Sequence, residues 1–78
     1  MKKVAIYSTP TCHFCQMAKE YFKSHNVSYQ EFDVASDMEK RKEMMDKSGQ
    51  LGVPVIIIDD QVTVGFDRPK LANLLGIK

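Results

Sequence analysis

Two cysteines lie three residues apart near the start of the chain, in the sequence Cys12-His13-Phe14-Cys15. At this spacing on a helix, two thiols are close enough to form a disulfide and to exchange it with a substrate disulfide. The same pair could be half of a zinc site or could have no chemical role. Structural zinc takes four ligands, however, and the chain offers only His13 and His25 besides the cysteines. Thiol–disulfide exchange is therefore the first hypothesis, and we expect no metal site.

Composition limits the classes of protein to which the chain can belong. Its 78 residues are 44% hydrophobic and 27% charged, with a formal net charge of +1. These values are typical of one globular domain, here residues 1–78, and they argue against a nucleic-acid-binding protein, which would carry a concentrated basic face. No apolar segment is long enough to span a membrane. Only Val4 to Tyr7 follow the basic residues Lys2 and Lys3, which is too short for a signal-peptide core, so we expect a cytoplasmic protein.

The elements around the cysteines explain how they could react. Val4 to Tyr7 predicts a short buried strand, and a helix is expected from about Cys12 to Ser24, with apolar residues at helical spacing. Cys12 would lie at the helix N-terminus, where unpaired N–H groups and positive potential favour a thiolate and lower its pKa below the free value of about 8.5. Cys15 would lie one turn into the helix and deeper. We therefore expect Cys12 to attack the substrate and Cys15 to resolve the mixed disulfide.

The two residues between the cysteines allow two interpretations each. A protonated His13 would further favour the thiolate, or the residue is simply exposed at the start of the helix. Phe14 either contacts a partner or packs on the helix.

The remainder of the chain predicts five further elements. The most hydrophobic segment, Val53 to Ile58, should be a central strand, and Asp59-Asp60 should turn the chain back into an antiparallel strand. The expected order is β-α-β-α-β-β-α, with helices on both faces of the sheet. The other elements are a strand over Val27–Val34, a helix over Asp37–Lys47, a strand over Gln61–Val64 and a last short helix that follows Asp67 and is completed by Leu71–Leu75.

Local signals predict where these helices begin and end. Ser36 and Glu39 fit a capping box at the start of the second helix, and Gly49 should end it. Asp67 is the expected N-cap of the last helix, with Pro69 in its first turn. The methionines of the second helix, Met38, Met44 and Met45, are interpreted as core residues.

Three separated motifs resemble one family. They are Tyr7-Ser8-Thr9-Pro10-Thr11-Cys12-His13-Phe14-Cys15, Gly52-Val53-Pro54 and Gly65-Phe66-Asp67. Their order and spacing resemble the glutaredoxins and the glutaredoxin-like redoxins that serve ribonucleotide reductase. The resemblance implies an α/β protein with the thioredoxin fold, in which a four-stranded mixed sheet is covered by three helices.

The resemblance also implies a substrate groove. Pro54 would be a cis-proline that faces the cysteines, and the backbone of Val53 would pair with an extended substrate chain. Gly65, Phe66 and Asp67 would line this groove. Backbone N–H groups at the start of the last helix would bind a glutathione carboxylate, and Asp67 would bind the glutathione amino group or act only as an N-cap. No tightly bound cofactor is implied, and glutathione would be a co-substrate. The substrate-binding residues expected on this basis are Thr11, His13, Phe14, Val53, Pro54, Gly65, Phe66 and Asp67.

Three positions depart from the common glutaredoxin pattern and keep the electron donor open. His13 replaces a frequent proline, Thr9 replaces a frequent lysine, and Val64 replaces the first glycine of a usual Gly-Gly pair. The first hypothesis is a monomeric dithiol glutaredoxin that uses glutathione to reduce protein disulfides and glutathione-mixed disulfides. The alternative is a redoxin that thioredoxin reductase reduces and that donates electrons to ribonucleotide reductase. A third hypothesis is a dimer that bridges an iron–sulfur cluster through Cys12 and glutathione.

Overall fold

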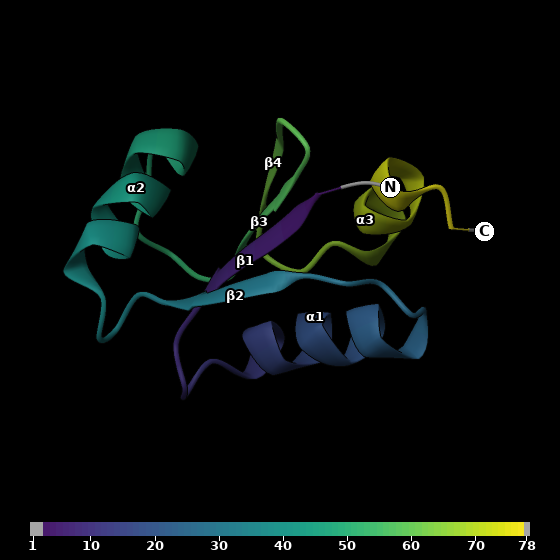
Figure 1. Ribbon diagram of the computed structural model, residues 1–78, viewed down its shortest axis with the longest axis horizontal. Coiled ribbons are helices and arrows are strands. Elements are labelled where there is room, and N and C mark those ends of the chain that lie inside the picture. The colour runs from purple at the N-terminus through teal and green to yellow at the C-terminus, as the bar shows by residue number, and fades with distance from the viewer. Residues whose placement is uncertain (1–2, 78) are drawn as a thin grey trace.

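A buried strand, β1 (Val4–Ser8), lies inside a four-stranded mixed sheet in the computed structural model, which describes residues 3–77 (Figure 1). The strand order is β2-β1-β3-β4. β1 pairs in parallel with β2 (Gln30–Asp33) and antiparallel with β3 (Val55–Ile58), which pairs antiparallel with β4 (Gln61–Val64). The helices are α1 (His13–Ser24), α2 (Met38–Ser48) and α3 (Arg68–Leu75). The β-α-β-α-β-β-α order and the thioredoxin-type mixed sheet are as predicted.

Both faces of the sheet are covered, as the apolar content of β3 requires. Alternate residues of a strand point to opposite faces, and all four residues of β3 are buried. One face packs Ile6 and Ile56 against Phe22 of α1 and Leu71 of α3. On the opposite face, Met44 of α2 belongs to a second buried cluster, together with Tyr7, Val55 and Ile57 of the sheet and with Val34. None of the helices among residues 3–77 is long and apolar enough to cross a membrane.

The register of the sheet brings three connecting segments to one end. Tyr7 of β1 pairs with Val55 of β3, and Val55 pairs with Val64 of β4. The chain therefore leaves β1, enters β3 and leaves β4 at the same end of the sheet. Residues 9–12, 53–54 and 65–67 meet there although they are far apart in the sequence.

The start of α2 differs from the prediction. Asp37, not Ser36, is the N-cap, and its carboxylate accepts a hydrogen bond from the Lys40 N–H at 3.1 Å. Ser36 belongs to the preceding turn, in which its N–H donates to the Asp33 carbonyl. The predicted capping box with Glu39 is therefore wrong. A carboxylate at the N-cap has the added advantage of interacting with the positive end of the helix. The predicted end at Gly49 is confirmed, with φ of 74°.

The methionine prediction is also wrong for two of its three residues. Only Met44 is buried, whereas Met38 and Met45 are 68% and 49% exposed. Met45 is one position and Met38 is six positions away from the buried Met44, so neither lies on the face that α2 turns to the sheet, and both point to solvent. The predicted core therefore receives one methionine from this helix.

Two strands are shorter than predicted. β2 begins at Gln30 rather than Val27, because Val27 is still bound to the end of α1 through its N–H and the Phe22 carbonyl at 2.8 Å. β3 begins at Val55 rather than Val53, after Pro54, which has no N–H to donate to a neighbouring strand. The last helix begins at Arg68, directly after the predicted N-cap Asp67, and ends at Leu75 as predicted.

Candidate active site

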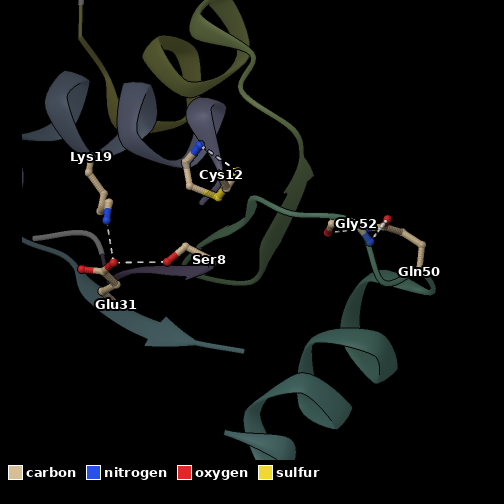
Figure 2. The surroundings of a disulfide bond; sticks show 7 residues. Ser8, Cys12, Lys19, Glu31, Gln50 and Gly52 are labelled. Atoms are coloured by element: carbon tan, nitrogen blue, oxygen red, sulfur yellow. Dashed lines mark hydrogen bonds and ion pairs between the residues drawn. A yellow bond between two sulfur atoms is a disulfide. The ribbon is translucent and has the colours of Figure 1, made fainter. Parts of the chain in front are cut away.

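Cys12 and Cys15 are joined as a disulfide at the N-terminus of α1, with their Cα atoms 5.2 Å apart. Cys12 is the N-cap, and its backbone is extended, whereas Cys15 lies inside the first turn. The Cys15 N–H donates a hydrogen bond to Cys12 Sγ at 3.1 Å (Figure 2). The sulfur of Cys12 therefore takes the place that a serine or aspartate oxygen holds at other N-caps. A thiolate at this atom would be stabilised by the same N–H and by the helix dipole.

Exposure separates the two cysteines. Cys15 is completely buried, whereas Cys12 is partly exposed. A substrate can therefore approach Cys12, whereas Cys15 is shielded from solvent. This arrangement is the one that an attacking and a resolving thiol require.

The residues next to Cys12 face solvent. Thr11 and His13 are exposed, and Phe14 is 57% exposed, so Phe14 is not one of the apolar residues by which α1 packs on the sheet. The His13 and Phe14 rings lie edge to face with centroids 5.7 Å apart. These three side chains therefore form an accessible surface beside the disulfide.

The second segment at this end of the sheet contains Val53 and Pro54. The Val53–Pro54 peptide bond is cis, as the resemblance implies, and Pro54 is buried. The Pro54 carbonyl accepts a hydrogen bond from the Gly65 N–H at 2.8 Å, which ties this segment to the one after β4. No residue in the described part of the chain forms a hydrogen bond with the N–H or C=O of Val53. Val53 therefore keeps both backbone groups available.

The third segment, Gly65 to Asp67, divides its residues between two environments. Gly65 has φ of 83°, a conformation that favours glycine. Phe66 turns toward α1, where its ring meets Tyr21 edge to face at 6.0 Å and lines a surface cavity of about 270 Å³ between α1 and α3. The Asp67 carboxylate accepts a hydrogen bond from the Lys70 N–H at 3.2 Å as the N-cap of α3. The structure thus brings Gly65 next to Pro54 but packs Phe66 into the interface between helices.

A polar network lies near the disulfide, and no pattern in the sequence predicts it. Ser8 is 1% exposed, and its hydroxyl donates to Glu31 Oε2 at 3.2 Å (Figure 2). Lys19 of α1 forms an ion pair with the same oxygen at 2.7 Å. The hydrogen bond from Lys19, followed by its charge and the hydrogen bond from Ser8, lowers the pKa of Glu31 despite partial burial. The network links α1, which carries the cysteines, to β1 and to the edge strand β2.

A second unpredicted contact lies in the loop before Pro54. The side-chain amide of Gln50 bonds to both backbone groups of Gly52, as Figure 2 shows. Side-chain bonds to a backbone two residues away are common for short polar residues. A glutamine followed by a glycine at this distance has no established sequence signature, so only the structure reveals the contact.

No group of three or more histidine, cysteine, aspartate or glutamate side chains that could hold a metal ion is present within residues 3–77.

Comparison with known families agrees with this site. The family model described as Glutaredoxin matches residues 4–63, which is most of the chain. The chain belongs to the glutaredoxin family. The fold, the two cysteines and the family together make it a thiol–disulfide oxidoreductase.

Individual glutaredoxin-like relatives cover nearly all of the chain. An uncharacterized glutaredoxin-like 8.6 kDa protein in the rubredoxin operon of Clostridium pasteurianum is 47% identical over 72 residues, covering 92% of this chain and 96% of the relative. Glutaredoxin 3 of Escherichia coli K12 is 42% identical over 67 residues, with 86% and 81% covered. The glutaredoxin-like protein NrdH of Lactococcus lactis is 30% identical over 74 residues, with 91% and 97% covered.

A solved structure also matches. The thioredoxin-like protein BC3987 superposes with a TM-score of 0.87 at 36% identity, with 92% of this chain and 99% of that chain covered.

Proposed function

We propose that this glutaredoxin-family protein reduces disulfides carried on peptides and proteins, with Cys12 as the attacking thiol and Cys15 as the resolving thiol. The observation that supports these roles is the difference between the two sulfurs. Cys12 is partly exposed and its Sγ accepts a hydrogen bond from the Cys15 N–H, whereas Cys15 is completely buried.

The proposed cycle transfers two electrons from the dithiol to the substrate. The Cys12 thiolate attacks one sulfur of the substrate disulfide, forms a mixed disulfide and releases the other substrate sulfur as a thiolate, which takes a proton from water. The Cys15 thiol then loses its proton and attacks Cys12 Sγ. The Cys12–Cys15 disulfide forms, and the second substrate sulfur leaves as a thiolate.

Substrate binding is proposed to use the residues that the resemblance suggests around the disulfide. The unpaired N–H and C=O of Val53 can pair with the backbone of an extended substrate, as an added strand pairs with a sheet edge. Thr11, His13 and Phe14 would contact the substrate from the side of α1, because they are exposed there. Pro54 and Gly65 would form the opposite side of the groove. Phe66, which packs on Tyr21, and Asp67, the N-cap of α3, would border the groove at its α3 end.

Glutathione is the proposed electron donor. Two glutathione molecules would reduce the Cys12–Cys15 disulfide and leave as glutathione disulfide. The 42% identity to glutaredoxin 3 supports this choice. A second candidate is a thioredoxin reductase, as in the redoxin hypothesis with ribonucleotide reductase as the electron acceptor, and the relative named NrdH favours it. Thr9 also favours this second candidate, since it provides no cation beside Cys12 for a glutathione carboxylate.

One experiment distinguishes the two donors. The oxidised protein is supplied with NADPH and either glutathione with glutathione reductase or thioredoxin reductase alone, and NADPH consumption is followed. We expect sustained turnover with glutathione in the presence of a disulfide substrate. Turnover with thioredoxin reductase alone would instead establish the redoxin function, and no turnover with either donor would reject the proposed function.

A further inference from the structure

We propose that the side chain of Gln50 acts as a clamp that aims the N–H of Val53 at the backbone of a bound substrate. Gln50 would thereby select disulfides that are carried on a peptide chain. Gln50 is a positioning residue in this proposal, because it acts through Val53 and does not touch the reacting sulfurs. The inference rests on the proposed function, in which Val53 pairs with the substrate.

The clamp consists of two hydrogen bonds to one residue. Gln50 Nε2 donates to the Gly52 carbonyl at 3.0 Å, and Gln50 Oε1 accepts the Gly52 N–H. Figure 2 shows the amide of Gln50 folded against the backbone of Gly52, in the loop that runs toward the Cys12–Cys15 disulfide in that view. Both backbone groups of Gly52 are therefore occupied within the loop itself.

This contact determines the direction of the Val53 N–H. The Gly52 carbonyl and the Val53 N–H belong to the same planar peptide unit, and this unit is trans, so the two groups point in opposite directions. When Gln50 holds the carbonyl, the Val53 N–H must point away from Gln50. That N–H has no hydrogen-bond partner among residues 3–77 and is free to bind a substrate carbonyl.

Gly52 allows the clamp to close because it has no side chain. A Cβ atom at this position would lie 2.6 Å from Gln50 Oε1, which is too close for the amide to stay in place. Gly52 does not have the positive φ that favours glycine at positions such as Gly49 and Gly65, so its backbone conformation does not require glycine. The close approach of Gln50 is the reason that the structure provides for a glycine here.

Both ends of the loop are held in place. The Ser48 hydroxyl lies within hydrogen-bond distance of two carbonyls that can accept its single proton, Met44 at 2.6 Å and Gln50 at 2.9 Å, and its oxygen accepts the Gln50 N–H at 3.4 Å, so Ser48 ties Gln50 to the end of α2. On the other side, the Pro54 carbonyl accepts the Gly65 N–H. Between these two anchors, the Gln50 amide is the side chain that holds the peptide unit of Val53.

The test compares substrates with and without a peptide backbone. The reduced protein is mixed with glutathione disulfide, which has peptide groups, or with 2-hydroxyethyl disulfide, which has none. The rate of oxidation of the Cys12–Cys15 pair is then measured by thiol alkylation and mass spectrometry. We expect Gln50→Ala to lower the second-order rate constant with glutathione disulfide about fivefold, as for the loss of one hydrogen bond, and to leave the other rate constant unchanged.

Three further variants sharpen the test. In Gln50→Glu, the carboxylate still accepts the Gly52 N–H but cannot donate to the Gly52 carbonyl. Its rate constant with glutathione disulfide should therefore fall at least as far as that of Gln50→Ala. Gly52→Ala should lower the rate constant with glutathione disulfide as much as Gln50→Ala does. The double variant Gln50→Ala/Gly52→Ala should lower it no further than either single variant, because all three open the same clamp. Gln61→Ala is the matched control, since this exposed glutamine lies at the far end of the sheet, opposite Ile58.

The outcomes separate the inference from the proposed function. Equal losses with both disulfides, additive losses in the double variant, or no loss in Gln50→Ala would overturn the clamp. A parent protein that reacts with neither disulfide would overturn the proposed function and the clamp with it.

Discussion

Cys12 has two roles at a single atom, because its sulfur caps α1 and is also the proposed nucleophile. The cap requires only an atom that accepts the Cys15 N–H, whereas the attack requires a thiolate. Serine satisfies the first requirement and not the second. A substitution at this position can therefore remove the chemistry and keep the helix.

We expect Cys12→Ser to abolish disulfide reduction and to leave the thermal unfolding temperature of the reduced protein within about 3 °C of the parent's, since a change below about 0.5 kcal/mol is small for a domain of this size. Activity is measured with glutathione-mixed and protein disulfides, and stability by circular dichroism. Substantial activity in Cys12→Ser would show that Cys12 is not the attacking thiol.

Cys15 should behave differently. Cys15→Ser should keep the reduction of glutathione-mixed disulfides and lose that of protein disulfides, because the first reaction needs no internal resolving thiol. The serine hydroxyl would be completely buried, so Cys15→Ala serves as a second variant without that polar group. If both variants were inactive with both substrates while folded, the roles of the two cysteines would be assigned wrongly.

Thr63 places a polar side chain in the hydrophobic core. It is 1% exposed, and its hydroxyl finds no hydrogen-bond partner among residues 3–77. Thr63→Val removes the buried hydroxyl and keeps the shape of the side chain, so we expect a gain of about 1 kcal/mol in the free energy of unfolding, measured by urea denaturation. Thr63→Ser is the control, because it keeps the hydroxyl and should lose stability. A less stable Thr63→Val would reveal a hydrogen bond to bound water.

Among the elements, α2 contributes one buried side chain to the core, as α3 does. Met44 is its single completely buried residue, and a polar contact supplements it. The buried hydroxyl of Tyr7 donates to Glu43 Oε1 at 2.8 Å, and Lys40 and Lys47 pair with the same carboxylate. This polar contact matters for the site, because the loop with Gln50 continues from the end of α2.

The contact makes the docking of α2 depend on pH. The hydrogen bond from Tyr7, and then those from Lys40 and Lys47, lower the pKa of Glu43 from 4.5 to about 2. The folded state therefore gains stability above pH 4.5 that is lost as pH falls toward 2. Burial, and then the hydrogen bond to Glu43, raise the pKa of Tyr7 from 10.0 to about 12. The corresponding stability is complete below pH 10 and is lost as pH rises toward 12.

We expect Tyr7→Phe to lower the free energy of unfolding by about 1 kcal/mol near pH 7, since the partly exposed Glu43 limits the gain from the hydrogen bond. The difference from the parent should shrink below pH 4.5 and above pH 10. Urea denaturation over a range of pH measures it. A difference that stays constant with pH would mean that the hydrogen bond to Glu43 contributes nothing.

At the scale of the whole molecule, the site exists because the sheet pairs β1, β3 and β4 in one register. Cys12, Val53 and Gly65 come from three segments that meet only when Tyr7, Val55 and Val64 lie side by side. The monomeric state that we expect from the sequence stays a prediction. The cytoplasmic location that the sequence favours also stays a prediction.

We expect small-angle scattering to give a radius of gyration close to the 11.5 Å of the Cα atoms. A globular dimer would measure about 15 Å by the usual scaling with chain length. The absorbance spectrum of the freshly purified protein should show no band at wavelengths longer than the absorption of its aromatic side chains. A larger particle with a brown colour would contradict the monomer and support the iron–sulfur hypothesis.

The sequence by itself determined the features that depend on neighbouring residues. The Cys12–Cys15 spacing, the order of the elements, the N-cap at Asp67 and the end of α2 at Gly49 follow from interactions within a few positions of the chain. The motifs around Pro54 and Gly65 identified the family, because they retain their spacing. These features cover the fold and the sulfur chemistry.

Only the tertiary structure decided which side chains face inward and which backbone groups remain free. Phe14 and Met38 are apolar residues at helical spacing, yet both point to solvent, because the sheet reaches only one face of each helix. Phe66 packs on Tyr21, and the amide of Gln50 closes over Gly52, through contacts that depend on where the loops lie. Periodicity and spacing describe one element at a time, whereas burial and pairing depend on elements that lie far apart in the sequence.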